Sequence, residues 1–263
     1  MHGGCSASPP RPSSIRSACE AGPRPFQQHE RQVSRGSARR ASRRRGRNRA
    51  RGGREGDHLA GAADGGGQRG PIQVADGEPY LYPITPRTNF LVELDEIPED
   101  VMRRARILYL NYPNNPTGAL YSDELLMGII EIAREHNLVV MADEVYDKVL
   151  YDDVKHTAIA SLSTDVLTLT FNSLSKSYRS CGYRAGWLVV SGDKKPARDY
   201  IEGLNMLSSM RLCANVPGQN AIQTALGGYQ TITDLIKPGG RLCRQRDLAY
   251  ELITAIPGVT CFK

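Results

Sequence analysis

Short apolar runs alternate with helix-like stretches along the chain from about residue 71 onward. Buried strands of parallel sheets read as short, mostly apolar runs that are bounded by polar or turn-forming residues. Four runs of this kind are 106–110, 138–142, 167–171 and 187–190. We expect each of them to form a strand.

A helix is predicted between the first two of these runs. Apolar residues recur there at the spacing of one helical face, namely at Leu125, Leu126, Ile129, Ile130 and Ala133. Ser122 is placed to cap the helix, and Asp123 and Glu124 suit its N-terminal end. Gly128 would weaken the helix by about 1 kcal/mol. Asn137 can end it in the left-handed conformation.

Further helices are predicted after the last strand. They begin near Pro196, after Pro217 and near Arg241, and the last ends before Pro257. Strands that alternate with helices indicate βαβ units, so we expect a three-layer α/β sandwich with a mainly parallel sheet. In such sheets ligands bind at the carboxyl ends of the strands.

Residues 1–70 differ from the rest in composition. They hold 15 arginines, no lysine and five acidic residues, a net charge of +10, although the whole chain of 263 residues carries only +6. Large apolar residues are few and follow no period, so this segment is predicted to be disordered. The domain organisation is therefore a disordered Arg/Gly/Ser-rich segment (1–70) followed by one folded domain (71–263).

Three interpretations of the basic segment are open. Residues 31–54 could bind nucleic-acid phosphates, or the segment could be a transit peptide. It could also be a stretch translated in the wrong frame or from a wrong start. Arginine without lysine favours the third interpretation, because phosphates accept either cation. The lack of interleaved aromatic residues makes a nucleic-acid partner less favoured.

The rest of the composition excludes some classes of protein. No run of 18 apolar residues exists, so no membrane span is expected. The six cysteines are scattered and form no Cys-x-x-Cys pair, so neither a zinc site nor another metal site is expected. Reduced thiols indicate a cytoplasmic protein.

Four short polar motifs lie at or near the predicted strand ends. They are 114–118 (NNPTG), 142–146 (ADEVY), 173–176 (SLSK) and 182–187 (GYRAGW). Each has an ordinary structural explanation when taken alone: a Pro-Gly turn, a helix-capping carboxylate, a solvated lysine and a turn with a surface arginine.

Taken together, the motifs have a specific order and spacing. Asp143 follows Asn115 by 28 residues, Tyr146 follows three later, Lys176 30 later and Arg184 eight later. This pattern resembles the cofactor-binding signature of fold-type-I, class I/II aminotransferases, which depend on pyridoxal 5′-phosphate (PLP). The resemblance covers roughly residue 77 to the end of the chain.

Other stretches point to branches of that family. Residues 211–217 and 223–230 resemble bacterial glutamate–pyruvate (alanine) aminotransferases most closely. Residues 112–118 are also similar to the LL-diaminopimelate branch.

The resemblance implies a role for each residue of the pattern. Lys176 would form the Schiff base with PLP and then act as a general base, and burial would favour its neutral amine. Asp143 would keep the pyridine nitrogen protonated. Tyr146 and Asn115 would donate hydrogen bonds to the 3′-oxygen of the ring. Lys176, Asp143 and Tyr146 are the catalytic candidates.

The phosphate group of PLP needs cations and donors. The resemblance assigns that role to Arg184 and Ser173, with Ser175 as a weaker candidate. Glu144 adjoins Asp143, but neighbours on a strand face opposite ways. A glycosidase-type carboxylate pair is therefore not expected.

The implied function is transamination between an amino acid and a 2-oxo acid, with alanine and 2-oxoglutarate as the expected pair. The family resemblance also implies a homodimer, with Asn215 to Pro217 near the contact. Two alternatives stay open: another fold-type-I PLP enzyme, such as a lyase or a synthase, and a nucleic-acid-binding protein that uses the basic segment.

The chain also departs from the family pattern. The family's phosphate-cradling loop and the aromatic residue that stacks on PLP would lie upstream of the matching region, where the Arg/Gly-rich segment stands. The arginine that binds the substrate α-carboxylate would lie beyond Lys263. We therefore expect an incomplete aminotransferase domain, possessing the central cofactor-anchoring motifs but with little activity by itself.

Overall fold

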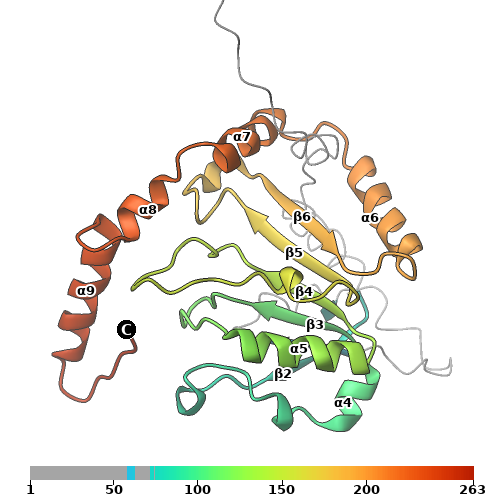
Figure 1. Cartoon of the computed structure of the whole chain (residues 1–263), viewed down its shortest axis with the longest axis horizontal. Coiled ribbons are helices and arrows are strands. Elements are labelled where there is room, and N and C mark those ends of the chain that lie inside the picture. Colours follow the sequence, from blue (N-terminus) through green and yellow to red (C-terminus); the bar gives the residue numbers. More distant parts are fainter. Residues whose placement is uncertain (1–57, 63–71, 74) are drawn as a thin grey trace, which may run out of the picture.

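One mainly parallel sheet forms the centre of the molecule (Figure 1). The computed structural model describes residues 58–62, 72–73 and 75–263. Within them, six strands lie in the order β2-β1-β3-β4-β5-β6, and every neighbouring pair is parallel except β5 with β6. The strands are β1 (His58–Ala62), β2 (Glu78–Tyr82), β3 (Ala105–Asn111), β4 (Val139–Asp143), β5 (Thr168–Ser173) and β6 (Gly186–Ser191). The α/β class and the mainly parallel sheet predicted from the sequence are confirmed, and the four predicted strands correspond to β3 to β6.

Helix α5 (Asp123–Glu135) confirms the predicted amphipathic helix. The Ser122 Oγ accepts the Leu125 N–H at 3.3 Å, which caps the first turn. The side chains buried on its inner face are Leu126, Ile129, Ile130 and Ala133. Asn137, just past the helix end, has a φ of 52° in the left-handed region.

Gly128 has a packing role that its helix propensity does not indicate. A Cβ at this position would lie 3.1 Å from Cδ1 of Leu94, which is tighter than ordinary contact. The glycine therefore lets the short 3₁₀ turn at Leu94–Glu96 pack against α5.

The remaining helices form an arc that begins beside β6 and continues down the left side of the sheet in Figure 1. They are α6 (Arg198–Met210), α7 (Val216–Gly227), α8 (Thr231–Ile236) and α9 (Arg241–Thr254); a short helix, α4 (Glu99–Arg104), precedes β3. The predicted starts near Pro196, Pro217 and Arg241 correspond to α6, α7 and α9. None of the helices in the described part of the chain has the length and apolar character needed to cross a membrane.

The main core lies between α5 and one face of the sheet. Leu108, Leu110, Val140 and Ala142, which are almost fully buried, face the apolar side of α5. On the opposite face, Tyr109, Met141 and Asp143 are only half-buried within the described structure. Side chains alternate along a strand, so one face of β3 and β4 supports the fold and the other is accessible.

The position of β1 differs from the sequence prediction. Residues 1–70 were expected to be a disordered segment, yet His58–Ala62 lies within the sheet and pairs with both β2 and β3. These five residues show neither the alternation of a half-buried strand nor the run of large apolar residues typical of a buried one, so no local pattern indicated a strand. The rest of 1–70, including the basic stretch 31–54, lies outside the described residues.

Candidate active site

The carboxyl ends of β3, β4 and β5 meet at one edge of the sheet. In the register, Asn111 of β3 is opposite Asp143 of β4, which is opposite Phe171 of β5. The loops that leave these three ends carry the predicted site residues, so the fold brings together motifs that are far apart in the sequence. This is the edge at which parallel α/β sheets bind ligands.

Asp143 is the last residue of β4 and is held at both carboxylate oxygens. Its Oδ1 accepts the Val145 N–H at 3.3 Å, and its Oδ2 accepts the Tyr109 hydroxyl at 3.4 Å. Tyr109 lies on the same half-buried face of the sheet. The side chain is therefore oriented on the accessible face, where a ligand could reach it.

Lys176 and Tyr146 come together from neighbouring loops. Tyr146 lies in the turn after β4 and Lys176 in the turn after β5, and the Lys176 Nζ lies 5.5 Å from the centre of the Tyr146 ring. This distance is within the range of a cation–π contact. Lys176 is exposed in the described structure, so the burial expected to favour its neutral amine is not present.

Hydrogen bonds fix both ends of the turn that carries Lys176. Ser173 is buried at the end of β5, and its Oγ accepts the Ser175 N–H at 3.2 Å. The Ser180 N–H donates to the Leu174 carbonyl at 2.9 Å, which closes the turn. An exposed lysine on a fixed backbone can reach a ligand while its Cα stays in place.

Arg184 approaches the same edge from β6. It adopts a left-handed backbone (φ 48°), and its Nη1 donates to the Cys181 carbonyl at 2.8 Å. Two residues later, Gly186 pairs with Ser173, and a Cβ at Gly186 would lie 2.8 Å from the Asn172 carbonyl. The glycine thus permits the close approach of β6 that places Arg184 near the end of β5.

Asn115 lies in the loop after β3, in a structured turn. Its N–H donates to the Asn111 Oδ1 at 2.8 Å, while its side chain is exposed. Asn114 is buried and pairs with Ala119 through the backbone at 2.8 Å. The Pro-Gly turn considered from the sequence is therefore a compact loop that presents Asn115 to the sheet edge.

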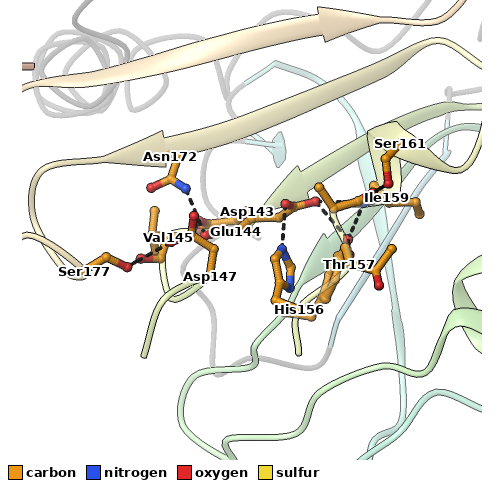
Figure 2. A network of polar contacts seen from close by, with 12 residues as sticks. Asp143, Glu144, Val145, Asp147, His156, Thr157, Ile159, Ser161, Asn172 and Ser177 are labelled. Carbon is orange, nitrogen blue, oxygen red and sulfur yellow. Dashed lines mark hydrogen bonds and ion pairs between the residues drawn. The ribbon is translucent and has the colours of Figure 1, made fainter. Parts of the chain in front are cut away.

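A buried polar cluster behind this edge was missed by the sequence reasoning (Figure 2). Glu144 is only 3% exposed, and its Oε1 accepts the Tyr112 hydroxyl at 2.8 Å and the Ile159 N–H at 3.2 Å. Its Oε2 lies 2.9 Å from Nε2 of His156. Burial first, and the neighbouring Glu144 carboxylate second, raise the pKa of Tyr112 well above its usual range. Alternation along the strands could have indicated that these two side chains are buried, because Glu144 and Tyr112 each lie two positions after a buried strand residue.

Asp143 and Glu144 therefore act on different faces of the sheet. Asp143 contacts Tyr109 on the accessible face, and Glu144 contacts Tyr112 on the α5 face. This agrees with the expectation that the two carboxylates do not form a pair that acts on one substrate.

Comparison with known proteins agrees with the class that the fold and this edge indicate. The sheet, with a lysine and an aspartate at adjacent strand ends, has the arrangement expected of PLP-dependent transferases. The chain belongs to the aminotransferase class I and II family, because the model of that family matches residues 71–263. Members of this family depend on PLP.

Individual relatives give the same result. The chain is 56% identical over 192 residues to the glutamate–pyruvate aminotransferase AlaA of Escherichia coli (strain K12), covering 73% of this chain and 47% of that protein. It is 50% identical over 190 residues to an alanine aminotransferase of Mycobacterium bovis, covering 72% and 44%. The chain thus spans about half the length of the curated relatives it matches.

Solved structures share the fold. An aminotransferase from Escherichia coli superposes with a TM-score of 0.74 at 53% identity, covering 77% of this chain and 50% of that one. The alanine aminotransferase of Pyrococcus furiosus gives a TM-score of 0.69 at 28% identity, covering 77% and 51%.

Proposed function

We propose that the protein is a PLP-dependent aminotransferase that moves an amino group between alanine and 2-oxoglutarate. The observation that carries the proposal is the meeting of Asp143 and Lys176 at the ends of adjacent strands, with the Lys176 amine 5.5 Å from the centre of the Tyr146 ring. The choice of substrates rests on the 50–56% identity to proteins named glutamate–pyruvate or alanine aminotransferase.

The residues at this edge fit the chemical groups of PLP. The cofactor has a dianionic phosphate, a phenolic oxygen, a ring nitrogen and an aldehyde. Arg184 and the Ser173 hydroxyl suit the phosphate, and Ser175 is a secondary candidate. Asn115 and Tyr146 can each donate a hydrogen bond to the phenolic oxygen.

When bound, PLP supplies an electron sink for the electron pair left on the substrate Cα. The Asp143 carboxylate holds a proton on the ring nitrogen by charge–charge attraction. The Lys176 Nζ would hold the cofactor aldehyde, and its amine would take the proton from the substrate Cα. The contact with the Tyr146 ring keeps the lysine side chain over the turn that follows β4.

Peptide mapping tests the anchoring residue. The chain is incubated with PLP, reduced with borohydride and digested, and the cofactor mass is expected on the peptide that contains Lys176. Lys176→Ala should remove that mass. Lys148→Ala is the matched control, because Lys148 lies in the neighbouring loop and 6.0 Å from the Tyr178 ring centre. Labelling of Lys148 or Lys155 instead would contradict the assignment.

A product assay tests the reaction. With alanine, 2-oxoglutarate and PLP, transamination produces pyruvate and glutamate in equal amounts. A lyase would instead release ammonia without need of a 2-oxo acid. Ammonia release in the absence of 2-oxoglutarate would therefore favour the alternative fold-type-I reaction.

We also propose that the protein is a homodimer in the cytoplasm. Helix α6 and the segment after it expose apolar side chains, among them Met206, Met210 and Leu212, the last two at 71% and 72% exposure. A second copy could cover them, close to Asn215–Pro217. The four cysteines of the described residues are free thiols, which is typical of a reducing compartment. Light scattering coupled to size-exclusion chromatography measures the mass in solution, and a monomer at micromolar concentration would contradict the dimer.

A further inference from the structure

The buried Glu144 carboxylate accepts hydrogen bonds from three residues that belong to two separate segments of the chain (Figure 2). The Tyr112 hydroxyl comes from the segment after β3, and the His156 ring and the Ile159 N–H come from the segment before β5. A buried carboxylate is costly unless its oxygens are satisfied. Here both carboxylate oxygens accept hydrogen bonds, so the carboxylate can hold the two segments together.

The contacts of the cluster place donors against both oxygens of Glu144. The Tyr112 hydroxyl and the Ile159 N–H face Oε1, and the His156 ring faces Oε2. The Nδ1 of His156 is buried with no partner among the described residues. A ring with its proton on Nε2 therefore fits best, because the other tautomer would bury an unpaired N–H.

The main chain of Glu144 is fixed as firmly as its side chain. Its N–H donates to the Phe171 carbonyl at 3.0 Å, and its carbonyl accepts from the Asn172 Nδ2 at 3.2 Å. Both partners belong to β5, immediately before Ser173. Asp143 directly precedes this residue and Tyr146 follows it by two positions.

Two further contacts connect the cluster to the loops of the site. The Tyr112 N–H donates to the Asp143 carbonyl at 3.2 Å, at the base of the loop that carries Asn115. The Ser177 hydroxyl, next to Lys176, is 3.1 Å from the Val145 carbonyl and 2.9 Å from the Asp147 carboxylate. The loops after β3, β4 and β5 are therefore joined to one another through the residues around Glu144.

We propose that Glu144 is a positioning residue for the groups that bind PLP. Its carboxylate, held by Tyr112 and His156, fixes the base of the loop after β3 against the end of β4, and its main chain holds the end of β4 against β5. The inference rests on the proposed function, since it concerns the same site. It predicts a preformed site whose affinity for PLP depends on a side chain that never touches the cofactor.

Glu144→Gln tests the proposal with almost no change in shape. A glutamine has one acceptor oxygen and one donor nitrogen. Its nitrogen would face either the Tyr112 and Ile159 donors or the His156 ring, which would then have to carry its proton on the buried Nδ1. In the first orientation Tyr112 and Ile159 lose the Glu144 oxygen and keep only the Thr157 carbonyl and the Tyr112 oxygen as acceptors. In the second, the proton on Nδ1 has no acceptor among the described residues. Either change weakens the link between the segments, so the loops are expected to relax.

The measurements are made with the 263-residue chain and PLP itself. Glu144→Gln is expected to raise the dissociation constant for PLP at least tenfold and to shift the pH midpoint of the bound cofactor's absorbance, because Asp143 moves away from the ring nitrogen. Lys176 should still be labelled by borohydride at saturating PLP. Ile130→Ala is the control: it destabilises the core beside α5 but should leave both cofactor measurements unchanged at temperatures where the chain is folded.

A pair of variants at His156 keeps the test decisive if Glu144→Gln does not fold. His156→Gln retains an N–H donor close to the place of Nε2 and should stay within about threefold of the parent affinity, whereas His156→Ala should weaken PLP binding at least tenfold. Equal affinities in parent, Glu144→Gln and His156→Ala would overturn the positioning role while leaving the proposed function intact. Failure of the parent chain to label Lys176 would overturn the proposed function and this inference with it.

Discussion

The two faces of the sheet differ at the end of β4. On the α5 face, Val140, Ala142 and Glu144 are buried and fully engaged in packing or hydrogen bonds. On the opposite face, Met141 and Asp143 are half-buried. Adjacent residues of one strand thus serve different purposes: the alternation of side chains separates the groups that would meet a ligand from those that hold the loops in place.

The largest expected effect is on the stability of the buried face. Ile130→Ala should lower the free energy of unfolding by about 2–5 kcal/mol, because it removes fully buried methyl groups and leaves a cavity against β3 and β4. Met141→Ala on the other face should cost clearly less. Urea denaturation of both variants measures the difference. Equal losses would mean that the two faces are packed alike.

The free energy of unfolding should also depend on pH, because the core contains buried tyrosines. Burial raises the pKa of Tyr121 to about 12, whereas a tyrosine in the unfolded chain loses its proton near pH 10. The unfolded state therefore gains stability as the pH rises from about 10 to 12, and the folded protein should lose about 2–3 kcal/mol over that window. Tyr112, whose pKa is also raised, adds to the loss. Tyr121→Phe should reduce the loss between pH 10 and 12, as measured by denaturation at each pH, and an unchanged profile would contradict the assignment.

On the accessible face, the expected effect is on the ligand rather than the fold. Asp143→Asn keeps the shape of the side chain but removes its charge, so PLP should bind about 10- to 100-fold more weakly. The free energy of unfolding should change by less than about 1 kcal/mol, because the group is half-buried. Cofactor titration and urea denaturation together separate these effects. A large loss of stability with normal affinity would make Asp143 a structural residue.

Ser175→Ala should have the smallest effect. The Ser175 N–H, which donates to the Ser173 Oγ, is retained in the variant, so the turn should keep its form. The affinity for PLP should fall less than about threefold. Ser173→Ala removes that acceptor as well as a phosphate donor and should weaken binding more. If Ser175→Ala weakened PLP binding more than Ser173→Ala, Ser175 would be the main phosphate contact and Ser173 the secondary one.

Much of this arrangement could be predicted from the sequence because it depends on local patterns. The strands β3 to β6 and helix α5 follow from apolar runs, helical spacing and the Ser122 cap. The site motifs lie at strand ends, so a parallel sheet is sufficient to bring them to one edge. The order and spacing of these motifs resemble those of the aminotransferase family, to which the family model assigns residues 71–263.

Other features depend on contacts between distant residues. The cluster joins Tyr112, Glu144 and Ile159 across 15 to 47 positions, and no local pattern indicates that these residues meet. Strand β1 has neither alternation nor a run of large apolar residues, and only its pairing with β2 and β3 reveals it. The exposure of Lys176 is likewise a property of what surrounds the turn, which its own sequence does not describe.

The position of β1 between β2 and β3 limits how far the chain can be shortened from its N-terminus. A sheet tolerates the loss of an outer strand better than that of an inner one, because removal of an inner strand exposes two rows of backbone donors and acceptors instead of one. A shortened chain that begins at residue 57 keeps β2 joined to β3 through β1. A shortened chain that begins at residue 70, where the composition changes, would lack β1. Strands β2 and β3 would then have unpaired edges that favour association with other chains.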